Sequence, residues 1–314
     1  MTQIIKFSKN HIRQARELVL ANYNEERAIV TALPQFDTIP DEAFKEFTDN
    51  GLGVTMLDGS RMLGFLCCDN PWDDAFGSVA KGTFVPDYGH GAIAENRGMI
   101  YKRLYQAAAE IWVNKGITYH SISLYAHDAR AIDAFFTYGF GMRCIDAVRS
   151  MTNFNHTICK DIVFDELAKA DIAKIRNMRK SLAAYLGESP SFMRWSDDFI
   201  KSWLSRTETR DSKVFAANLD AEPIAFMEVM EDGESFASAH DNMRNICGAF
   251  CLPQHRGKGV MQGLLNHVIT QLRADGFDSI GVDFESFNPL ANSFWLKYFT
   301  AYSYNVERKL MYMR

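Results

Sequence analysis

The sequence lacks long apolar runs, a secretory leader and an excess of positive charge. None of its apolar runs reaches the roughly 20 residues that a membrane span needs, and its first residues contain no secretory apolar core. The formal net charge of −5 argues against a general binder of nucleic acid or of anionic membranes. We therefore expect a cytoplasmic protein whose partners include neither nucleic acid nor a membrane.

Paired cysteine motifs are also absent. The six cysteines show no C-x-x-C spacing, and free thiols are ordinary in a reducing compartment, where they act as small core hydrophobes. Cys247 and Cys251 lie near each other in the sequence, but a zinc site needs further ligands that their spacing does not offer. The sequence therefore predicts no metal site.

The length and composition indicate two globular domains. A chain of 314 residues is too long for one typical compact domain and suits two domains of about 150 residues each. With 47% hydrophobic and 23% charged residues, both should bury ordinary cores.

A glycine-rich segment over 254–259 lies between an expected strand and an expected helix. The apolar run 246–253 precedes it, and helix-spaced apolar residues follow it at Val260, Leu264, Leu265, Val268 and Leu272. Gly257 and Gly259 allow the backbone to approach a ligand closely, and the unpaired N–H groups of a first helical turn favour an anion. The segment matches neither standard nucleotide loop. It is predicted to cradle a diphosphate, and the alternative is a glycine-rich turn without a ligand.

The pattern [QR]-x-x-G-x-[GA], met in full by Gln254, Gly257 and Gly259, resembles the acetyl-CoA signature of the GCN5-related N-acetyltransferase (GNAT) family. The elements expected downstream also follow that family's order. They are a helix to about Arg273, a turn at 275–277, a strand over 279–287 and a short helix opened by Asn288. The resemblance implies acetyl-CoA as cosubstrate and spans much of the C-terminal half.

An internal repeat relates the two halves of the chain. Residues 131–140 resemble residues 291–300, and the same offset aligns Asp128 with Asn288. With the resemblance, the repeat predicts a mixed α/β fold of two tandem GNAT-like units, each a mostly antiparallel mixed sheet flanked by helices. The expected domains are 1–152, a degenerate unit, and 160–314, the acetyl-CoA-binding unit.

The halves differ most at the cradle. Aligning Pro86 with Pro253 leaves seven extra residues in the loop of the N-terminal half, which lacks an intact signature before its helix. Its phosphate loop is expected to be rebuilt or lost. The prediction is one acetyl-CoA site, in the C-terminal half.

The resemblance assigns the cofactor contacts to the cradle and its flanks. The cofactor-binding candidates are Cys251, Leu252, Gln254, His255, Arg256, Gly257, Lys258, Gly259, Val260 and Asn288. In the family a backbone N–H on the cradle strand polarises the thioester, which maps near Cys251 or Leu252. Asn288 should cap its helix, and the resemblance also implies a contact with the pantetheine arm.

The catalytic candidates are Trp295, Tyr298 and Glu285. Trp295 stands where family members often carry a tyrosine acid, and indole cannot deliver a proton near neutral pH. Tyr298 should share a helix face with Trp295 and is the substitute acid, unless both simply pack the core. Glu285, near the end of its strand, is the candidate base, and a water relay is the alternative.

The expected activity is transfer of an acetyl group from acetyl-CoA to an amine of a small molecule or peptide, by direct attack. The main alternative is a non-catalytic acyl-CoA sensor or pseudoenzyme, favoured by the tryptophan at the tyrosine position. An aminoacyl or fatty-acyl transferase and a purely architectural repeat are the other classes. The intact cradle favours CoA over an aminoacyl-tRNA donor, and its preservation argues against a purely architectural repeat.

Overall fold

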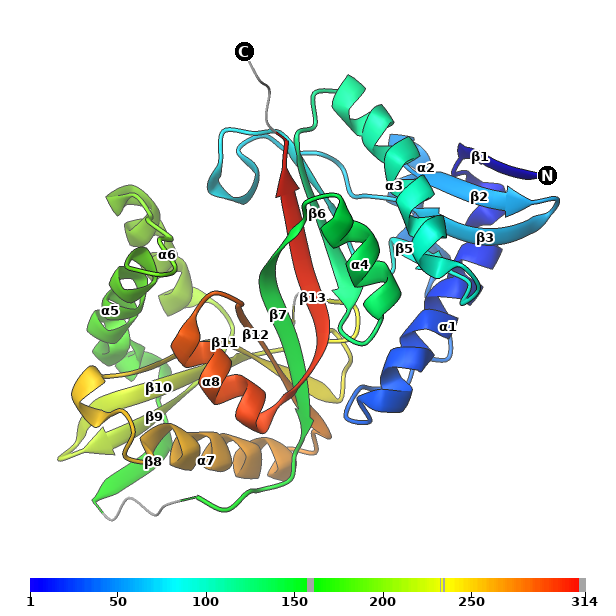
Figure 1. The fold of residues 1–314 in the computed structure, drawn as a ribbon. Coiled ribbons are helices and arrows are strands. Elements are labelled where there is room, and N and C mark those ends of the chain that lie inside the picture. Colours follow the sequence, from blue (N-terminus) through cyan, green and yellow to red (C-terminus); the bar gives the residue numbers. More distant parts are fainter. Residues whose placement is uncertain (157–160, 232, 234, 311–314) are drawn as a thin grey trace. The chain divides into compact units, whose positions relative to one another are not determined.

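The computed structural model describes residues 1–156, 161–231, 233 and 235–310. Residue contacts divide the chain into two compact units (Figure 1). The first comprises Met1–Asp146 and the segment that begins at Ala301, and the second spans Ala147–Thr300. Residues 157–160, in the predicted junction, lie outside the described part of the chain.

The first unit holds a four-stranded antiparallel sheet and a second group of strands. The sheet has the order β1 (Thr2–Lys6), β2 (Val54–Asp58), β3 (Arg61–Leu66) and β5 (His90–Ala92). The second group consists of β4 (Gly82–Val85), β6 (Tyr119–Tyr125) and β13 (Thr300–Lys309). The helices are α1 (Ile12–Ile29), α2 (Lys45–Asn50), α3 (Arg97–Asn114) and α4 (Ala129–Thr137).

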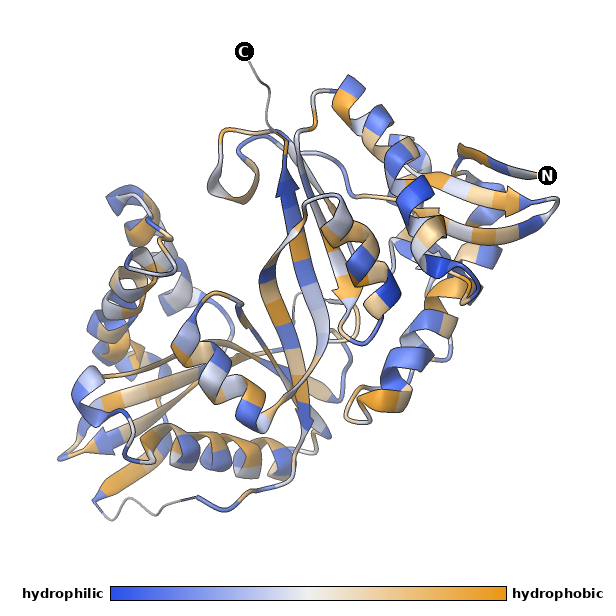
Figure 2. Cartoon of the chain, viewed as in Figure 1, coloured by the Kyte–Doolittle hydropathy of each residue, from blue (hydrophilic) through white to orange (hydrophobic). Residues whose placement is uncertain are grey.

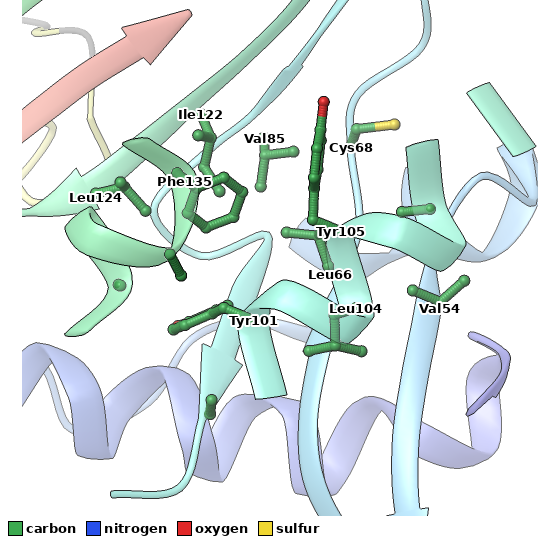
Figure 3. Packing of buried hydrophobic residues seen from close by; sticks show 14 of the residues in the cluster. Val54, Leu66, Cys68, Val85, Tyr101, Leu104, Tyr105, Ile122, Leu124 and Phe135 are labelled. Carbon is green, nitrogen blue, oxygen red and sulfur yellow. The ribbon is translucent and has the colours of Figure 1, made fainter. Parts of the chain in front are cut away.

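The core of the first unit forms around α3. Its Tyr101, Leu104 and Tyr105 are buried and gather with Phe135 of α4 (Figure 3). The Phe135 ring centroid lies 5.8 Å from that of Tyr101 and 5.7 Å from that of Tyr105. Each such buried side chain stabilises the fold by about 1.5–3 kcal/mol. The first unit therefore has a full core of its own.

The strand β13 belongs to the first unit, although it follows the whole second unit in the sequence. Residues Ser303–Lys309 of β13 pair antiparallel with Tyr119–Tyr125 of β6. The hydroxyls of Ser123 and Ser303 lie 2.6 Å apart between these strands. The predicted domain ranges, 1–152 and 160–314, stay a prediction, and nothing in the sequence pattern indicated that the chain returns in this way.

The second unit repeats the plan with a longer sheet. Its strands have the order β12 (Ser279–Glu285), β11 (Met243–Cys251), β10 (Glu222–Met230), β9 (Lys213–Leu219) and β8 (Ile162–Glu166). Its helices are α5 (Arg176–Gly187), α6 (Asp197–Thr209), α7 (Val260–Ala274) and α8 (Pro289–Tyr298). β7 (Gly141–Ser150) crosses the boundary between the ranges of the two units.

The predicted amphipathic helix of the second unit is α7. Its apolar face packs on the strands β8 to β11, while polar residues alternate with it along the helix (Figure 2). The buried face comprises Leu264, Leu265, Val268, Ile269 and Leu272. The sequence spacing therefore predicted both the helix and the face that it buries.

The strands β11 and β12 diverge, and this creates space beside β11. Their parallel pairing covers only Met243–Ile246 and Ser279–Val282. Beyond it, β11 continues along β10 as far as Cys251, with a β-bulge at Cys247 where the register shifts. From Cys247 onward, the edge of β11 that faced β12 is open.

The predicted alignment of Pro86 with Pro253 is wrong. Pro86 directly follows β4, which ends at Val85, and precedes β5, which pairs with β3 in the other sheet. In the first unit, Ala92 of β5 pairs with Gly64 of β3, and in the second, Cys251 of β11 pairs with Ala225 of β10. By this register the residue that corresponds to Cys251 is Ala92, which lies after Pro86. The following helix begins five positions after Ala92 but nine positions after Cys251. The cradle of the N-terminal half is therefore shortened, and the predicted seven-residue extension does not exist there.

Two helices begin at the predicted caps. The Asp128 carboxylate accepts a hydrogen bond from the N–H of Ala131 at 3.0 Å, and the Asn288 side chain accepts one from the N–H of Ala291 at 3.2 Å. Such caps contribute about 1 kcal/mol each. They determine where α4 and α8 start, directly after β6 and β12.

Candidate functional site

A cavity of about 360 Å³ lies in the second unit between α5, the end of β11, the glycine-rich loop and α8. Predicted site residues that line it are Cys251, His255, Arg256, Gly257, Val260, Asn288, Trp295 and Tyr298. Predicted residues that do not line it are Leu252, Gln254, Lys258, Gly259 and Glu285. The structure thus gathers the strand end, the loop and the last helix of the unit around one space.

The glycine-rich loop has the backbone of an anion cradle. Gly257 and Gly259 have φ values of +73° and +84°, a region that side-chain-bearing residues rarely adopt. Gly259 is the N-cap of α7 and supplies no capping side chain, which leaves the first-turn N–H groups to other acceptors. A Cβ added at Gly257 would meet nothing within 4 Å, so the loop is open on that side. This arrangement suits a diphosphate at the helix N-terminus.

The open edge of β11 presents backbone groups to the cavity. The N–H of Leu252 donates to Ile224 at 3.0 Å, so this group is occupied by β10. Because backbone groups alternate along an antiparallel ladder, the N–H and C=O of Cys251 point to the opposite edge, where β12 has diverged. Of the two predicted thioester-polarising positions, Cys251 therefore has the available edge.

Arg256 is held across the wall of the cavity. Its Nε donates to the carbonyl of Cys251 at 2.9 Å. Its guanidinium carbon lies 5.5 Å from the ring centroid of Tyr185 and 5.2 Å from that of Phe250, within the range of cation–π attraction. These contacts place a positive charge beside the glycine loop.

A neutral hydrogen bond joins α5 to the start of α8. The hydroxyl of Tyr185 donates to Oδ1 of Asn288 at 3.0 Å, the atom that also caps α8. Sequence reasoning missed Tyr185, because nothing in the α5 pattern distinguishes a cavity-lining tyrosine from one in the core. The apolar face of α5 was the only available signal.

The predicted catalytic aromatics lie on one wall of the cavity. Trp295 is buried, with its ring centroid 4.8 Å from that of Phe294. Tyr298 is half-buried and stacks on Phe154 with a centroid distance of 4.4 Å. Glu285 is the last residue of β12 and does not line the cavity. The proposed acid therefore faces the space, and the proposed base does not.

The Glu228 carboxylate is committed to ion pairs. It lies 2.7 Å from Nη2 of Arg179 and 2.6 Å from Nε of Arg210, and Ser212 donates to it at 2.7 Å. Burial alone would raise the pKa of Glu228, but the Arg210 hydrogen bond and the two guanidinium charges hold that pKa below its ordinary value. Such a carboxylate orders the end of α6 against the sheet and is a poor general base.

The cysteines beside the cavity are unsuited to nucleophilic catalysis. Burial raises the pKa of the Cys247 thiol to about 12 and that of the Cys251 thiol to about 11. A nucleophilic cysteine requires a thiolate near neutral pH. An acyl-cysteine intermediate is therefore disfavoured at both positions.

Within the described ranges, no group of three or more histidine, cysteine or acidic side chains is arranged to hold a metal ion. The same part of the chain contains no helix long and apolar enough to cross a membrane.

Two features define the class of the protein. The fold is mixed α/β, built from two similar units, and one unit carries a glycine cradle where a parallel strand pair diverges. Residues 178–299 match the model described as the acetyltransferase (GNAT) family. The predicted resemblance to this family is therefore confirmed for this segment.

Solved structures agree with this fold along nearly the whole chain. A GCN5-related N-acetyltransferase from Sphaerobacter thermophilus is 11% identical with a TM-score of 0.61, over 98% of this chain and 95% of that one. A tandem GNAT protein from the clavulanic acid biosynthesis pathway is 11% identical with a TM-score of 0.51, over 98% of each chain. No curated protein sequence matches the chain significantly. These likenesses establish the tandem GNAT-like fold.

Proposed function

We propose that the second unit binds acetyl-CoA and transfers its acetyl group to an amine of a small molecule or peptide. The observation that carries this proposal is the glycine cradle of a GNAT-family domain opening onto a cavity beside the free edge of β11. The diphosphate would lie at the first turn of α7, near Gly257 and Arg256. The pantetheine arm would follow the edge of β11 toward Ala249, with Asn288 on the opposite wall.

The proposed reaction is direct. The free amine attacks the thioester carbon, a C–N bond forms and the C–S bond breaks. The proton of the amine leaves through a water relay, since Glu285 does not line the cavity, and Tyr298 protonates the departing thiolate. The raised thiol pKa values of Cys247 and Cys251 favour direct attack over a covalent cysteine intermediate. The N–H at Cys251 would polarise the thioester carbonyl.

The second candidate function is a non-catalytic acyl-CoA sensor. The observation that favours it is the buried Trp295 at the position of the family tyrosine. Both functions require the same cofactor site, and only the enzyme releases free thiol from acetyl-CoA in the presence of amines.

The first experiment is a calorimetric titration of the whole chain with acetyl-CoA, alongside the Gly257→Glu variant. A glutamate at 257 places a negative charge where the diphosphate binds, so we expect one site in the native chain and about 100-fold weaker binding in the variant. Gly276→Glu is the matched control, because Gly276 also has positive φ, +95°, and open space around its Cα, but lies outside the cavity. Absence of binding by the folded native chain would overturn the proposal.

A further inference from the structure

A second hollow in the same unit lies at the C-terminal end of α6. It has a volume of about 440 Å³ and is lined by Trp203, Arg206, Thr207, Thr209 and Arg210. The hydroxyl of Thr207 donates to Leu204 at 2.9 Å, and that of Thr209 donates to Ser205 at 3.2 Å. Both hydroxyls therefore donate to backbone carbonyls of α6 itself. The hollow therefore presents two guanidinium groups beside an indole ring.

Arg210 connects this hollow to the reacting end of the cofactor site. Its Nη2 lies 3.3 Å from Sγ of Cys247, the bulge residue at which β11 loses β12 as a neighbour. Cys247 precedes Ala249 by two positions, and Ala249 lines the cofactor cavity. A strand advances about 3.3 Å per residue, so the two positions are separated by about 7 Å. Arg210 therefore contacts β11 two residues before the part of that strand that lines the cofactor cavity.

Positive charge exceeds negative charge around the hollow. Arg179 and Arg210 share the single carboxylate of Glu228, and Asp283 is the other acidic side chain whose charge acts on Arg210. Arg206 adds a third guanidinium. Among the described residues it pairs with no carboxylate, and it lies over the Phe199 ring at 5.9 Å. The described lining of the hollow contains two guanidinium groups and no carboxylate, which favours an anionic ligand.

Arg179 shares the Glu228 carboxylate with Arg210 but does not line the hollow. Its side chain is only 1% exposed, and its Nη1 has no hydrogen-bond partner within the described residues. Buried guanidinium nitrogens are normally hydrogen-bonded, because a buried donor without an acceptor has lost its water and gained nothing in return. Arg210 therefore shares its carboxylate partner with a buried arginine, so the Glu228 carboxylate compensates only part of the charge of this pair.

We propose, resting on the acetyl-transfer function above, that the acceptor amine also carries an anionic group, which Arg206 and Arg210 bind in this hollow. The amine then lies toward Cys247 and the open edge of β11, and the linker of the acceptor packs on Trp203. The forked donors of arginine suit carboxylate and phosphate alike. The acceptor class is therefore an amine bearing a carboxylate or a phosphate at a short distance.

The test measures binding of three matched series to the whole chain in the presence of CoA: amino acids, the same amines without the carboxylate, and aminoalkyl phosphates. Calorimetry gives each affinity. We expect one acidic series to bind at least about 10-fold more tightly than the plain amines, and the series that does so identifies the anion. Arg206→Gln should remove that preference and leave the binding of plain amines unchanged.

Arg103→Gln is the matched control, because it removes the same charge from an exposed site in the first unit. Equal affinities for all three series, or a preference that survives Arg206→Gln, would overturn the proposal. So would the absence of binding by every acidic probe. Failure of the acetyl-CoA titration, in contrast, would remove the proposed function itself, so the two results are separable.

Discussion

The two units contain cavities of the same volume, about 360 Å³, at equivalent places, yet their walls differ in kind. In the second unit the wall consists of a glycine loop, aromatic rings and a neutral hydrogen bond. In the first unit it consists of ion pairs around Arg97. The comparison shows that one fold can line this space with a glycine loop and uncharged groups or with its own ion pairs.

The ion pairs of the first unit bridge the elements that a cofactor would otherwise join. Arg97 lies 2.6 Å from the Glu25 carboxylate of α1 and 3.2 Å from the Asp128 carboxylate at the start of α4. Its Nε donates to the carbonyl of Ile93 at 3.3 Å. Arg256 makes the corresponding strand-end contact in the second unit, but there the α5–α8 bridge is the uncharged Tyr185–Asn288 pair. The shortened loop before α3 brings Arg97 into this place.

The repeat also contains a pair of tyrosines with different surroundings. Tyr138 and Tyr298 occupy matching positions at the ends of α4 and α8. The hydroxyl of Tyr138 donates to the carbonyl of Lys102 at 3.3 Å, whereas Tyr298 lines the cavity. The first tyrosine therefore bonds to its own unit's backbone, and the second lines the cavity.

The largest expected effect comes from breaking the charged bridge. Arg97→Ala leaves the mostly buried Asp128 without its cation, so the first unit should lose about 3 kcal/mol of stability. Hydrogen exchange of α3 would measure this loss. Arg130→Ala is the control, because this exposed arginine lines the same cavity and, within the described ranges, bonds only the carbonyl of Ala94, at 2.7 Å. A gain of a second acetyl-CoA site in Arg97→Ala would show that charge, and not the short loop, closes the first unit.

The next effect separates the two tyrosines. Tyr298→Phe removes the proposed acid, so kcat for thiol release should fall about 100-fold. Tyr138→Phe should leave kcat unchanged and cost only about 1 kcal/mol of stability for its lost hydrogen bond. Steady-state assays of both variants at several pH values test this difference. If Tyr298→Phe and the native chain had equal kcat, Tyr298 would not be the acid, and water would protonate the leaving thiolate.

The smallest effect concerns acid sensitivity of the first unit. Burial lowers the pKa of His90 to about 4 and that of His120 to about 4, against 6.5 in the unfolded chain. As the pH falls below 6.5, the unfolded chain takes up protons first, so stability decreases. Each histidine should cost about 2 kcal/mol between pH 7 and pH 5.

Urea unfolding of the first unit at pH 7, 6 and 5 checks this expectation. Burial raises the pKa of Glu26, which acts in the opposite direction, so the comparison of His90→Gln with the native chain isolates one histidine. That variant should lose about half of the pH dependence. A native midpoint that stays constant over this range would contradict the prediction.

The second unit was largely predictable from its sequence. The spacing of Val260, Leu264 and Val268 predicted α7, and the caps at Asp128 and Asn288 were predicted at the residues where the structure has them. These features depend on local patterns, which a sequence displays directly. The cradle was predictable for the same reason, because its glycines are required by local backbone geometry.

What could not be predicted depends on distant partners. Pro86 follows β4 directly, as the sequence indicated, but the pairing of β5 with β3 shows that the residues corresponding to the end of β11 come after it. The ion pairs of Glu228 join α5, the end of α6 and β10, and no sequence spacing reveals that three elements converge. The return of β13 to β6 is invisible for the same reason, since strand partners are chosen by tertiary packing.

Because β13 is the last strand in the sequence, the first unit is completed only after the whole second unit has been synthesised. The strand that completes the first unit leaves the ribosome long after the rest of that unit, because β6 ends at Tyr125 and its partner strand begins at Thr300. At synthesis rates of about 5–20 residues per second, β6 waits on the order of ten seconds or more for its neighbour. During that interval the nascent first unit exposes an unpaired edge of β6, and such edges can pair with other chains.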